Sequence, residues 1–171
     1  MFQDEARFGR INETKKCWSP KGTRPISKSQ IVREYTYAYS AVDPKDGTMD
    51  SLILPVVSNE AMALFLEEVS RRHDDEKIIM FMDCASWHGT KNLLIPNNIT
   101  LKHLPPYSPE LNPVEHVWEE LREKYFGNEA FNNMTAVEDR LEVGLRELEN
   151  NKHVIQSIAG FPWITTALKA F

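Results

Sequence analysis

The sequence has few cysteines and no long hydrophobic run. Its 171 residues include two cysteines, Cys17 and Cys84, which fit no zinc-ligand spacing and make a poor disulfide framework. No apolar stretch approaches the roughly 18 residues that a membrane-spanning helix needs. The first residues, from Met1 to Glu5, have neither the basic start nor the apolar stretch of a signal peptide. We therefore expect a protein of the cytoplasm that has no membrane partner.

Positive charge is also in deficit. Twenty Lys and Arg stand against 25 Asp and Glu, so the net charge is −5. This balance excludes nucleic-acid binding by overall charge alone. The charge is uneven, because residues 1–40 hold eight basic and four acidic residues, whereas residues 110–149 hold four and eleven. The plain interpretation is a basic loop and a solvated acidic helical end. The alternative is that a polyanion would meet the first part of the chain.

The hydrophobic pattern predicts one α/β domain over residues 1–171. Hydrophobic residues make up 42% of the chain, which is enough for one core. Tyrosines alternate along residues 31–42, a turn with Pro and Gly follows at 43–47, and residues 77–82 are almost wholly apolar. The predicted strands are 2–8, 31–42, 51–57, 77–82 and 99–104. The predicted helices are 59–72, 112–126, 135–148 and 154–158, with a short one near Lys91. This order favours a three-layer arrangement.

Two carboxylates lie at positions typical of functional sites, one after a strand and one in the first turn of a predicted helix. Asp83 directly follows the apolar strand, and ligands gather at that edge of an α/β sheet. A cap or loop role is the plainer alternative for Asp83. Glu115 lies in Asn112-Pro113-Val114-Glu115, which resembles a helix capping box, so capping alone would explain it. Glu115 also flanks the apolar stripe of its helix, from which it could face the sheet edge.

A third carboxylate, Asp4, lies inside a strand-like stretch. Acidic residues are disfavoured in strands, so Asp4 calls for a metal or a basic partner. The alternation of a strand would put Asp4 and Glu5 on opposite faces. Three carboxylates on separate elements suit Mg²⁺ or Mn²⁺ better than zinc. Sites of this kind can use two ions, roughly 3.5–4 Å apart, in phosphoryl transfer.

Three stretches resemble the catalytic domain of DDE transposases, namely Asp4–Gly9, Asp83–His88 and Leu104–Glu115. The closest group is that of the bacterial insertion-sequence transposases related to mariner elements, the IS-six-thirty group. The stretch Pro-Pro-Tyr-Ser-Pro-Glu-Leu-Asn-Pro-Val-Glu is long and specific. Trp18-Ser19-Pro20-Lys21-Gly22, and Trp118 placed three residues after Glu115, add to the resemblance.

The resemblance implies a ribonuclease-H-like fold with a mixed central sheet flanked by helices. It implies that Asp4, Asp83 and Glu115 are the catalytic residues and hold Mg²⁺ or Mn²⁺, with two ions in the active complex. His88 and Asn112 would support these ligands or contact phosphate. Trp18 and Trp87 could stack on bases, although core packing is expected for at least one of them. The DNA-binding residues would be Arg10, Lys15, Lys16, Lys21, Arg24, Lys28 and Arg33.

The implied activity is DNA transposition. Water would first cut the element end, and the freed 3′-hydroxyl would then attack target DNA, commonly at a TA dinucleotide. A homodimer is expected in the DNA complex, within a prokaryotic cytoplasm and in association with the nucleoid.

One departure from the family affects this expectation. Members normally carry a helix-turn-helix region before the catalytic domain, whereas here Met1 lies three residues before Asp4. We expect that region to be absent and nicking to be weak and non-specific. Two alternatives remain open. One is an impaired remnant that only binds DNA or oligomerises. The other is a nuclease or resolvase of the same fold, against which the proline-rich motif argues.

Overall fold

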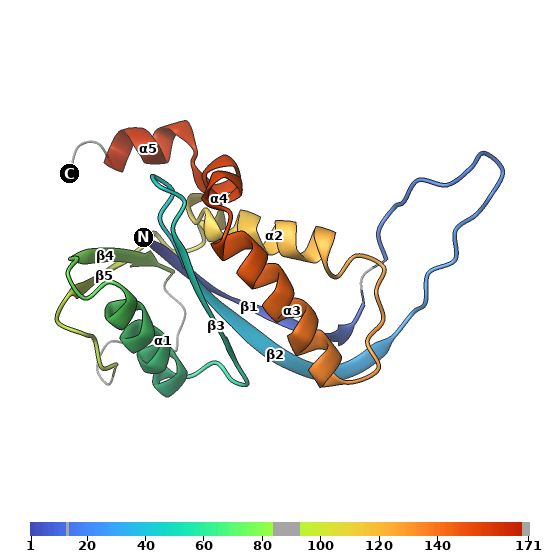
Figure 1. Ribbon diagram of the computed structural model, residues 1–171, viewed down its shortest axis with the longest axis horizontal. Helices are drawn as coiled ribbons and strands as arrows, with labels where there is room; N and C mark the ends of the chain where they lie inside the picture. The colour runs from blue at the N-terminus through green and yellow to red at the C-terminus, as the bar shows by residue number, and fades with distance from the viewer. Residues whose placement is uncertain (13, 84–92, 169–171) are drawn as a thin grey trace.

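The computed structural model describes residues 1–12, 14–83 and 93–168, and its centre is a five-stranded sheet (Figure 1). The strand order is β3-β2-β1-β4-β5. The first three strands pair antiparallel, and β4 pairs parallel with both β1 and β5, so the sheet is mixed. The strands are β1 (Phe2–Ile11), β2 (Ile31–Val42), β3 (Met49–Leu54), β4 (Ile78–Met82) and β5 (Ile99–His103).

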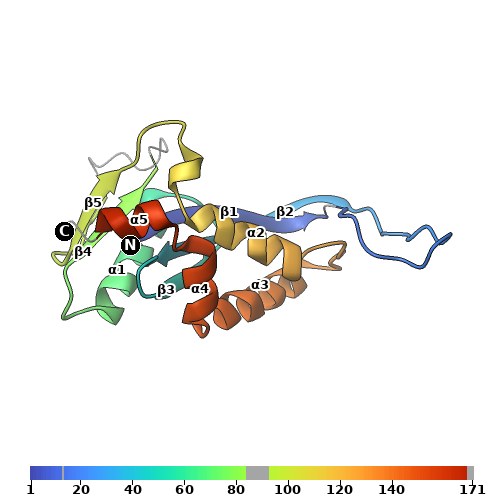
Figure 2. The same cartoon turned by 90° about the horizontal axis from the view of Figure 1, so that it is seen from above.

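Helices cover both faces of the sheet and make the fold three-layered. Helix α1 packs on one face, and α2, α3 and α4 pack on the other (Figures 1 and 2). None of the described helices is both long and apolar enough to cross a membrane. The helices are α1 (Asn59–Arg72), α2 (Val114–Lys124), α3 (Met134–Glu149), α4 (Lys152–Ala159) and α5 (Pro162–Leu168), and a 3₁₀ turn, η2 (Pro109–Leu111), precedes α2.

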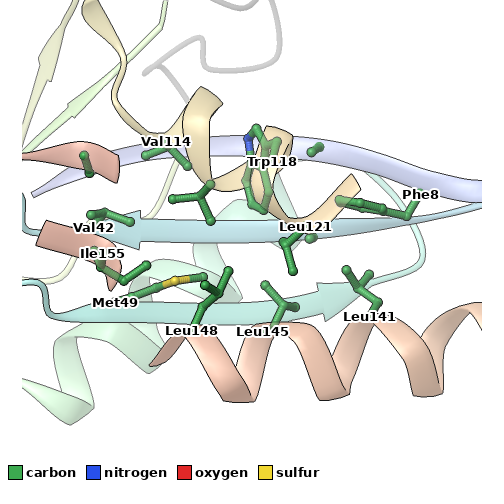
Figure 3. Packing of buried hydrophobic residues seen from close by; sticks show 14 of the residues in the cluster. Phe8, Val42, Met49, Val114, Trp118, Leu121, Leu141, Leu145, Leu148 and Ile155 are labelled. Atoms are coloured by element: carbon green, nitrogen blue, oxygen red, sulfur yellow. The ribbon is translucent and has the colours of Figure 1, made fainter. Parts of the chain in front are cut away.

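The larger core lies between the sheet and the helices α2 to α4. Side chains alternate along β1, so Phe2, Ala6 and Phe8 point to this face and are buried. The apolar stripe of α3 meets them from the other side, as Figure 3 shows. Its four residues are all buried and belong to the core: Val137, Leu141, Leu145 and Leu148.

Several local predictions are confirmed. Strand β2 and helix α1 have the predicted bounds. The Ser58 side chain accepts a hydrogen bond from the Ala61 backbone N–H and so caps α1. Gly47 adopts a φ of 77°, which the predicted turn requires. Leu64 has the helical spacing of a buried position in α1 but is 55% exposed, because the buried face is turned toward Met62 and Leu66.

Other bounds differ from the prediction. Strand β1 runs on to Ile11, β3 begins at Met49, and α3 is capped by Asn133 instead of Thr135. Helix α5 was not predicted, since its seven residues are too few for a clear helical period. Strand β4 is apolar on both faces, a pattern typical of a strand covered on both sides, yet Ile79 is 44% exposed. The short helix expected near Lys91 lies outside the described residues.

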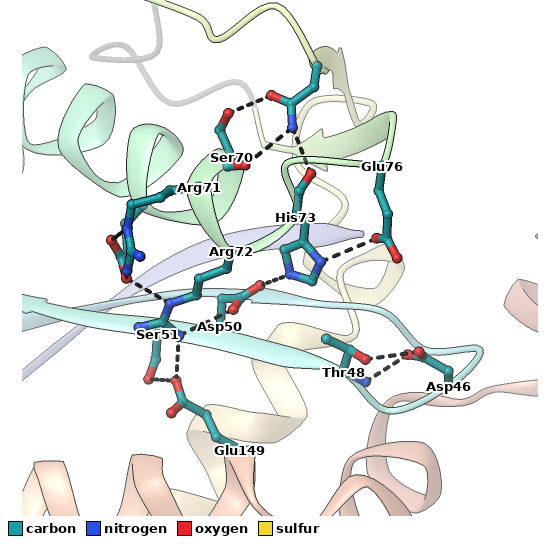
Figure 4. Close-up of polar contacts among 12 residues, drawn as sticks. Asp46, Thr48, Asp50, Ser51, Ser70, Arg71, Arg72, His73, Glu76 and Glu149 are labelled. Carbon is teal, nitrogen blue, oxygen red and sulfur yellow. Dashed lines mark hydrogen bonds and ion pairs between the residues drawn. The ribbon is translucent and has the colours of Figure 1, made fainter.

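A cluster of polar side chains around the buried Asp50 connects the two outer layers to β3 (Figure 4). Asp50 of β3 is only 4% exposed. One of its carboxylate oxygens lies 2.8 Å from His73 Nε2, and the other accepts a bond from Arg72 Nη1 at 3.2 Å. The same Arg72 nitrogen lies 3.7 Å from Glu149 of α3. The end of α1 and the end of α3 therefore meet across the edge strand.

Candidate active site

Two of the candidate carboxylates are positioned by neighbouring parallel strands. Asp4 lies on β1, and Asp83 directly follows β4. Phe2 of β1 pairs with Phe81 of β4, and their stacked rings have centroids 5.1 Å apart. Side chains two positions apart on a strand point to the same face. Asp4 and Asp83 are each two residues beyond this pair, so the register brings both to one face at the end of β4. Sequence reasoning expected a ligand site at this edge.

The third carboxylate, Glu115, comes from the first turn of α2. This helix buries Val114, Val117, Trp118 and Leu121 against the β1 side of the core. Glu115 flanks that buried stripe and is half-buried. A cavity of about 350 Å³ is lined by Asp4, Asp83 and Glu115, together with Asn112 and the loop from Leu104 to Pro109. The three predicted carboxylates therefore line one cavity.

Asn112 connects β1 to the start of α2. Its side-chain Nδ2 donates a hydrogen bond to the Gln3 carbonyl at 3.1 Å, and its Oδ1 accepts one from the Val114 N–H at 3.3 Å. The Asn112 carbonyl accepts a bond from the Glu115 N–H. Asn112 is 4% exposed, so these bonds are buried. The side chain links the residue before Asp4 to the turn that carries Glu115.

Half of the capping box predicted at this helix is formed. Asn112 is extended, Pro113 already has a helical φ of −66°, and Asn112 Oδ1 accepts the Val114 N–H as a side-chain cap. The reciprocal bond of a capping box would join the Asn112 N–H to the Glu115 carboxylate, but this N–H bonds to the Pro109 carbonyl. Capping therefore accounts for Asn112 and not for the Glu115 side chain.

Trp118 holds one oxygen of Asp4, a contact that sequence reasoning missed. The indole Nε1 donates to Asp4 Oδ2 at 2.8 Å. Trp118 itself is 1% exposed and packs in the core (Figure 3). On the sequence alone, Trp118 was used only as part of the family resemblance. Two signals were present: Trp118 lies three residues after Glu115 on the same helix face, and an indole N–H needs a partner when it is buried.

The pKa of Asp4 is raised to about 7, far above the 3.8 of a free aspartate, and burial is the largest cause. The hydrogen bond from Trp118 acts in the opposite direction, whereas the negative charges of Glu115, Glu5 and Asp83 add to the rise. A carboxylate in this setting is costly to ionise. A bound cation would offset that cost, so the electrostatics suit a cation site.

The donor chemistry of the cavity fits a hard divalent cation. All three acids offer carboxylate oxygens, which Mg²⁺ and Mn²⁺ prefer. Within residues 1–12, 14–83 and 93–168, no three His, Cys, Asp or Glu side chains are grouped closely enough to hold one ion. Mg²⁺ is often bound by one or two carboxylates, with waters and substrate phosphates completing the shell. Fewer than three of these acids would then hold each ion.

The predicted basic residues lie away from the cavity. Residues 14–30 form a long arm that projects from the sheet between β1 and β2 (Figures 1 and 2). Exposed cations follow this arm and the start of β2: Lys15, Lys16, Lys21, Arg24, Lys28 and Arg33. Arg10 differs from them, because its guanidinium donates to the Phe131 carbonyl and lies 2.6 Å from Glu34. Its charge is therefore paired within the protein.

Of the two tryptophans expected to stack on bases or to pack in the core, Trp18 is fully exposed on the arm. Trp87 lies outside the described residues, and so do Cys84 and His88, the residue expected to support the ligands or contact phosphate. Cys17 is a free, exposed thiol on the arm.

Comparison with known proteins identifies relatives of this chain. The family model for DDE superfamily endonucleases matches residues 1–138. A protein of Sinorhizobium fredii (strain NBRC 101917 / NGR234), the uncharacterized protein y4pE/y4sA, is 37% identical over 130 residues. The match covers 75% of this chain and 96% of that protein.

Solved structures of Mos1 share the fold. The Mos1 mariner paired-end complex with Mn has a TM-score of 0.61 at 18% identity, and the pre-cleavage Mos1 transpososome has 0.61 at 15%. Each comparison covers 94% of this chain and 55% of the Mos1 chain, so the chain spans about half the length of those proteins. The predicted class, a ribonuclease-H-like α/β fold with a mixed sheet, is confirmed.

Proposed function

The chain belongs to the DDE superfamily endonuclease family, and from this premise we propose that residues 1–171 are one catalytic domain of a DNA transposase. The reaction would be hydrolysis of a phosphodiester bond at an element end, followed by transfer of the 3′-hydroxyl into target DNA. The observation that carries the proposal is the cavity lined by Asp4, Asp83 and Glu115. Its acids come from three separate elements, which the fold brings together.

Each acid would have a distinct setting at the reacting phosphate. Asp4 is held in place by Trp118, which leaves its second oxygen for a ligand. Asp83 directly follows β4, and Asn112 links the first turn of α2, which carries Glu115, to Gln3 of β1. Asp4, Asp83 and Glu115 would hold Mg²⁺ or Mn²⁺. When bound, these ions lower the pKa of water and stabilise the charge of the transition state. His88 would contact phosphate or support a ligand.

DNA is the proposed partner. The cations of the arm and Arg33 are exposed and can pair with phosphates, a contact that does not read sequence. The similar Mos1 structures include a paired-end complex with a left transposon end and a strand transfer complex. By analogy with them, this chain would bind element ends and target DNA, at TA, as a homodimer. A prokaryotic cytoplasm, near the nucleoid, is the expected place.

A second candidate is a remnant that binds DNA or oligomerises without turnover. One observation favours it: among the described residues, no three His, Cys, Asp or Glu side chains are grouped closely enough to hold a single ion. Under this proposal the arm would still bind DNA, while the cavity would not cut it. The two candidates therefore differ in nicking and agree in binding.

Nicking of supercoiled plasmid separates the two candidates. The purified chain should nick plasmid with Mg²⁺ or Mn²⁺, weakly and without sequence preference, and should be inactive with EDTA. Asp83→Asn should lower the nicking rate by about 1,000-fold or more, because it removes a charged ligand. Asp75→Asn is the matched control. It makes the same chemical change at an exposed carboxylate between α1 and β4 and should leave nicking unchanged.

The outcomes are distinct. DNA binding without nicking in every metal would favour the remnant. Nicking that is equal in the wild type and in Asp83→Asn would show that the cavity is not the active site. Joining of a labelled 3′-hydroxyl end into plasmid would identify a transposase, whereas nicking without joining would indicate a plain nuclease.

A further inference from the structure

An aromatic side chain beside the candidate active site has no role in the packing of the fold. Tyr107 is 101% exposed. Its backbone has a φ of 58°, in the left-handed region that a bulky residue rarely adopts. Glycine or asparagine would occupy this position at lower conformational cost. Neither the core nor the backbone of this loop therefore accounts for a tyrosine here.

The loop places this ring at the edge of the carboxylate cavity. Tyr107 lines the cavity together with Asp4, Asp83 and Glu115. Prolines stand at 105, 106 and 109, and they restrict the φ angles on both sides of the tyrosine. The Leu111 N–H bonds to the Ser108 carbonyl, so the 3₁₀ turn η2 starts directly after the ring. The ring is thus presented by a restrained loop that leads into α2.

A flat, exposed aromatic beside an anionic cavity is suited to a particular kind of ligand. Aromatic side chains stack on nucleobases, and this stacking tolerates any base because each has a π-face. A rigid ring binds at low entropic cost. The carboxylates would repel a phosphate unless cations intervene, so the ring would supply attraction that does not depend on charge.

We propose that Tyr107 is a stacking platform for an unpaired nucleobase next to the scissile phosphate. This inference rests on the proposed function, because it requires DNA at the cavity. Tyr107 would act as a positioning residue. By holding one base it would fix the strand, so that the neighbouring phosphate lies over Asp4, Asp83 and Glu115.

Fluorescence of 2-aminopurine tests this proposal. The probe is a DNA duplex with a single-stranded 3′ extension and one 2-aminopurine at the junction. Ca²⁺ is added as the divalent cation between the carboxylates and the DNA phosphate, because oxygen ligands bind it. The wild type should quench the probe on binding. Tyr107→Leu and Tyr107→Gly should abolish the quenching and weaken binding by about 5- to 100-fold. Tyr107→Phe and Tyr107→Trp should retain both, since they keep a ring.

Thermal unfolding separates positioning from a structural role. Tyr107→Gly should unfold at the same temperature as the wild type or higher, because it relieves the left-handed φ and removes no buried contact. Binding and quenching equal to the wild type in Tyr107→Leu would overturn the inference and leave the proposed function standing. Failure of the wild type to bind any DNA would overturn both.

Discussion

At the scale of single residues, the central feature is a carboxylate that the fold makes hard to ionise. Asp4 is largely buried, lies near three other acids, and has one oxygen bonded to Trp118. Those acids disfavour its ionised form, and the indole N–H favours it. A residue with this balance is stabilised by whatever brings positive charge to its second oxygen. The pH dependence of stability and the affinity for cations should therefore report on the same group.

The stability of the metal-free chain should fall as pH rises through the range in which Asp4 ionises. The unfolded chain ionises Asp4 near 3.8 and the folded chain near 7, so the folded state binds more protons between these values. Asp4→Asn cannot ionise and escapes this loss. The variant should be the more stable protein at about pH 8, by up to about 4 kcal/mol.

Urea unfolding across pH measures this difference. The free energy by which Asp4→Asn is the more stable protein should grow between pH 3.8 and about pH 7 and then level off. Mn²⁺ should stabilise the wild type and not the variant, because it favours the ionised carboxylate. Parallel curves for the two proteins across this range would contradict the account.

Trp118 offers a second test at this scale. Trp118→Phe keeps an aromatic ring in the core and removes the N–H that favours ionised Asp4. The pKa of Asp4 should rise further, so the rising limb of the nicking rate should move to higher pH. Leu121→Ala is the control, since Leu121 is buried on the same helix and has no bond to Asp4. It should lower stability and leave the pH profile unchanged, and a shifted profile in both variants would refute this role of Trp118.

At the scale of elements, regular patterns made the scaffold predictable. The alternating tyrosines marked β2, and Ser58 marked the start of α1, because strand alternation and side-chain capping are local. The edge at Asp83 could be predicted from an apolar strand that ends in an acid. The predictions were wrong where local signals were weak. The start of β3 was misplaced, and α5 was not predicted.

The details of the site depend on contacts between elements. The Trp118 bond joins residues 114 positions apart in sequence, and the Asn112 bond to Gln3 joins residues 109 apart. No period or motif encodes such pairings. The exposure and positive φ of Tyr107 are likewise not encoded by any period in the sequence. Sequence could name the three acids, through a family resemblance, and could not say what holds them.

The arm provides a test of DNA contact at this scale. Replacing Lys15, Lys16 and Lys21 together with Gln should weaken binding to all DNA sequences alike. The slope of log affinity against log salt concentration should also become less steep, by about 0.9 for each duplex phosphate contact that is lost. Nicking measured at saturating DNA should persist, since the cavity is untouched.

Three exposed cations elsewhere provide the matched control for the arm. Arg71, Arg140 and Arg146 lie on α1 and α3. Changing all three to Gln removes the same charge and should leave the salt dependence close to that of the wild type. An equal loss of binding in both triple variants would indicate a general charge effect and would argue against the arm.

At the scale of the whole molecule, charge is divided between two regions. The net charge is −5, yet the arm presents exposed cations and the cavity presents carboxylates at the sheet edge. DNA held by the arm would approach a cavity that repels phosphate until cations are bound. Binding by the arm and cleavage at the cavity should therefore respond differently to divalent metal.

The most direct test of the central claim is the anomalous signal of a crystal soaked in Mn²⁺. The account predicts a peak in the cavity, bonded to carboxylate oxygens of at least two of Asp4, Asp83 and Glu115. The peak should be lost in Asp83→Asn crystals soaked in the same way. A cavity without a peak, while Mn²⁺ binds at other carboxylates of the same crystal, would contradict the assignment of these three acids as the active site.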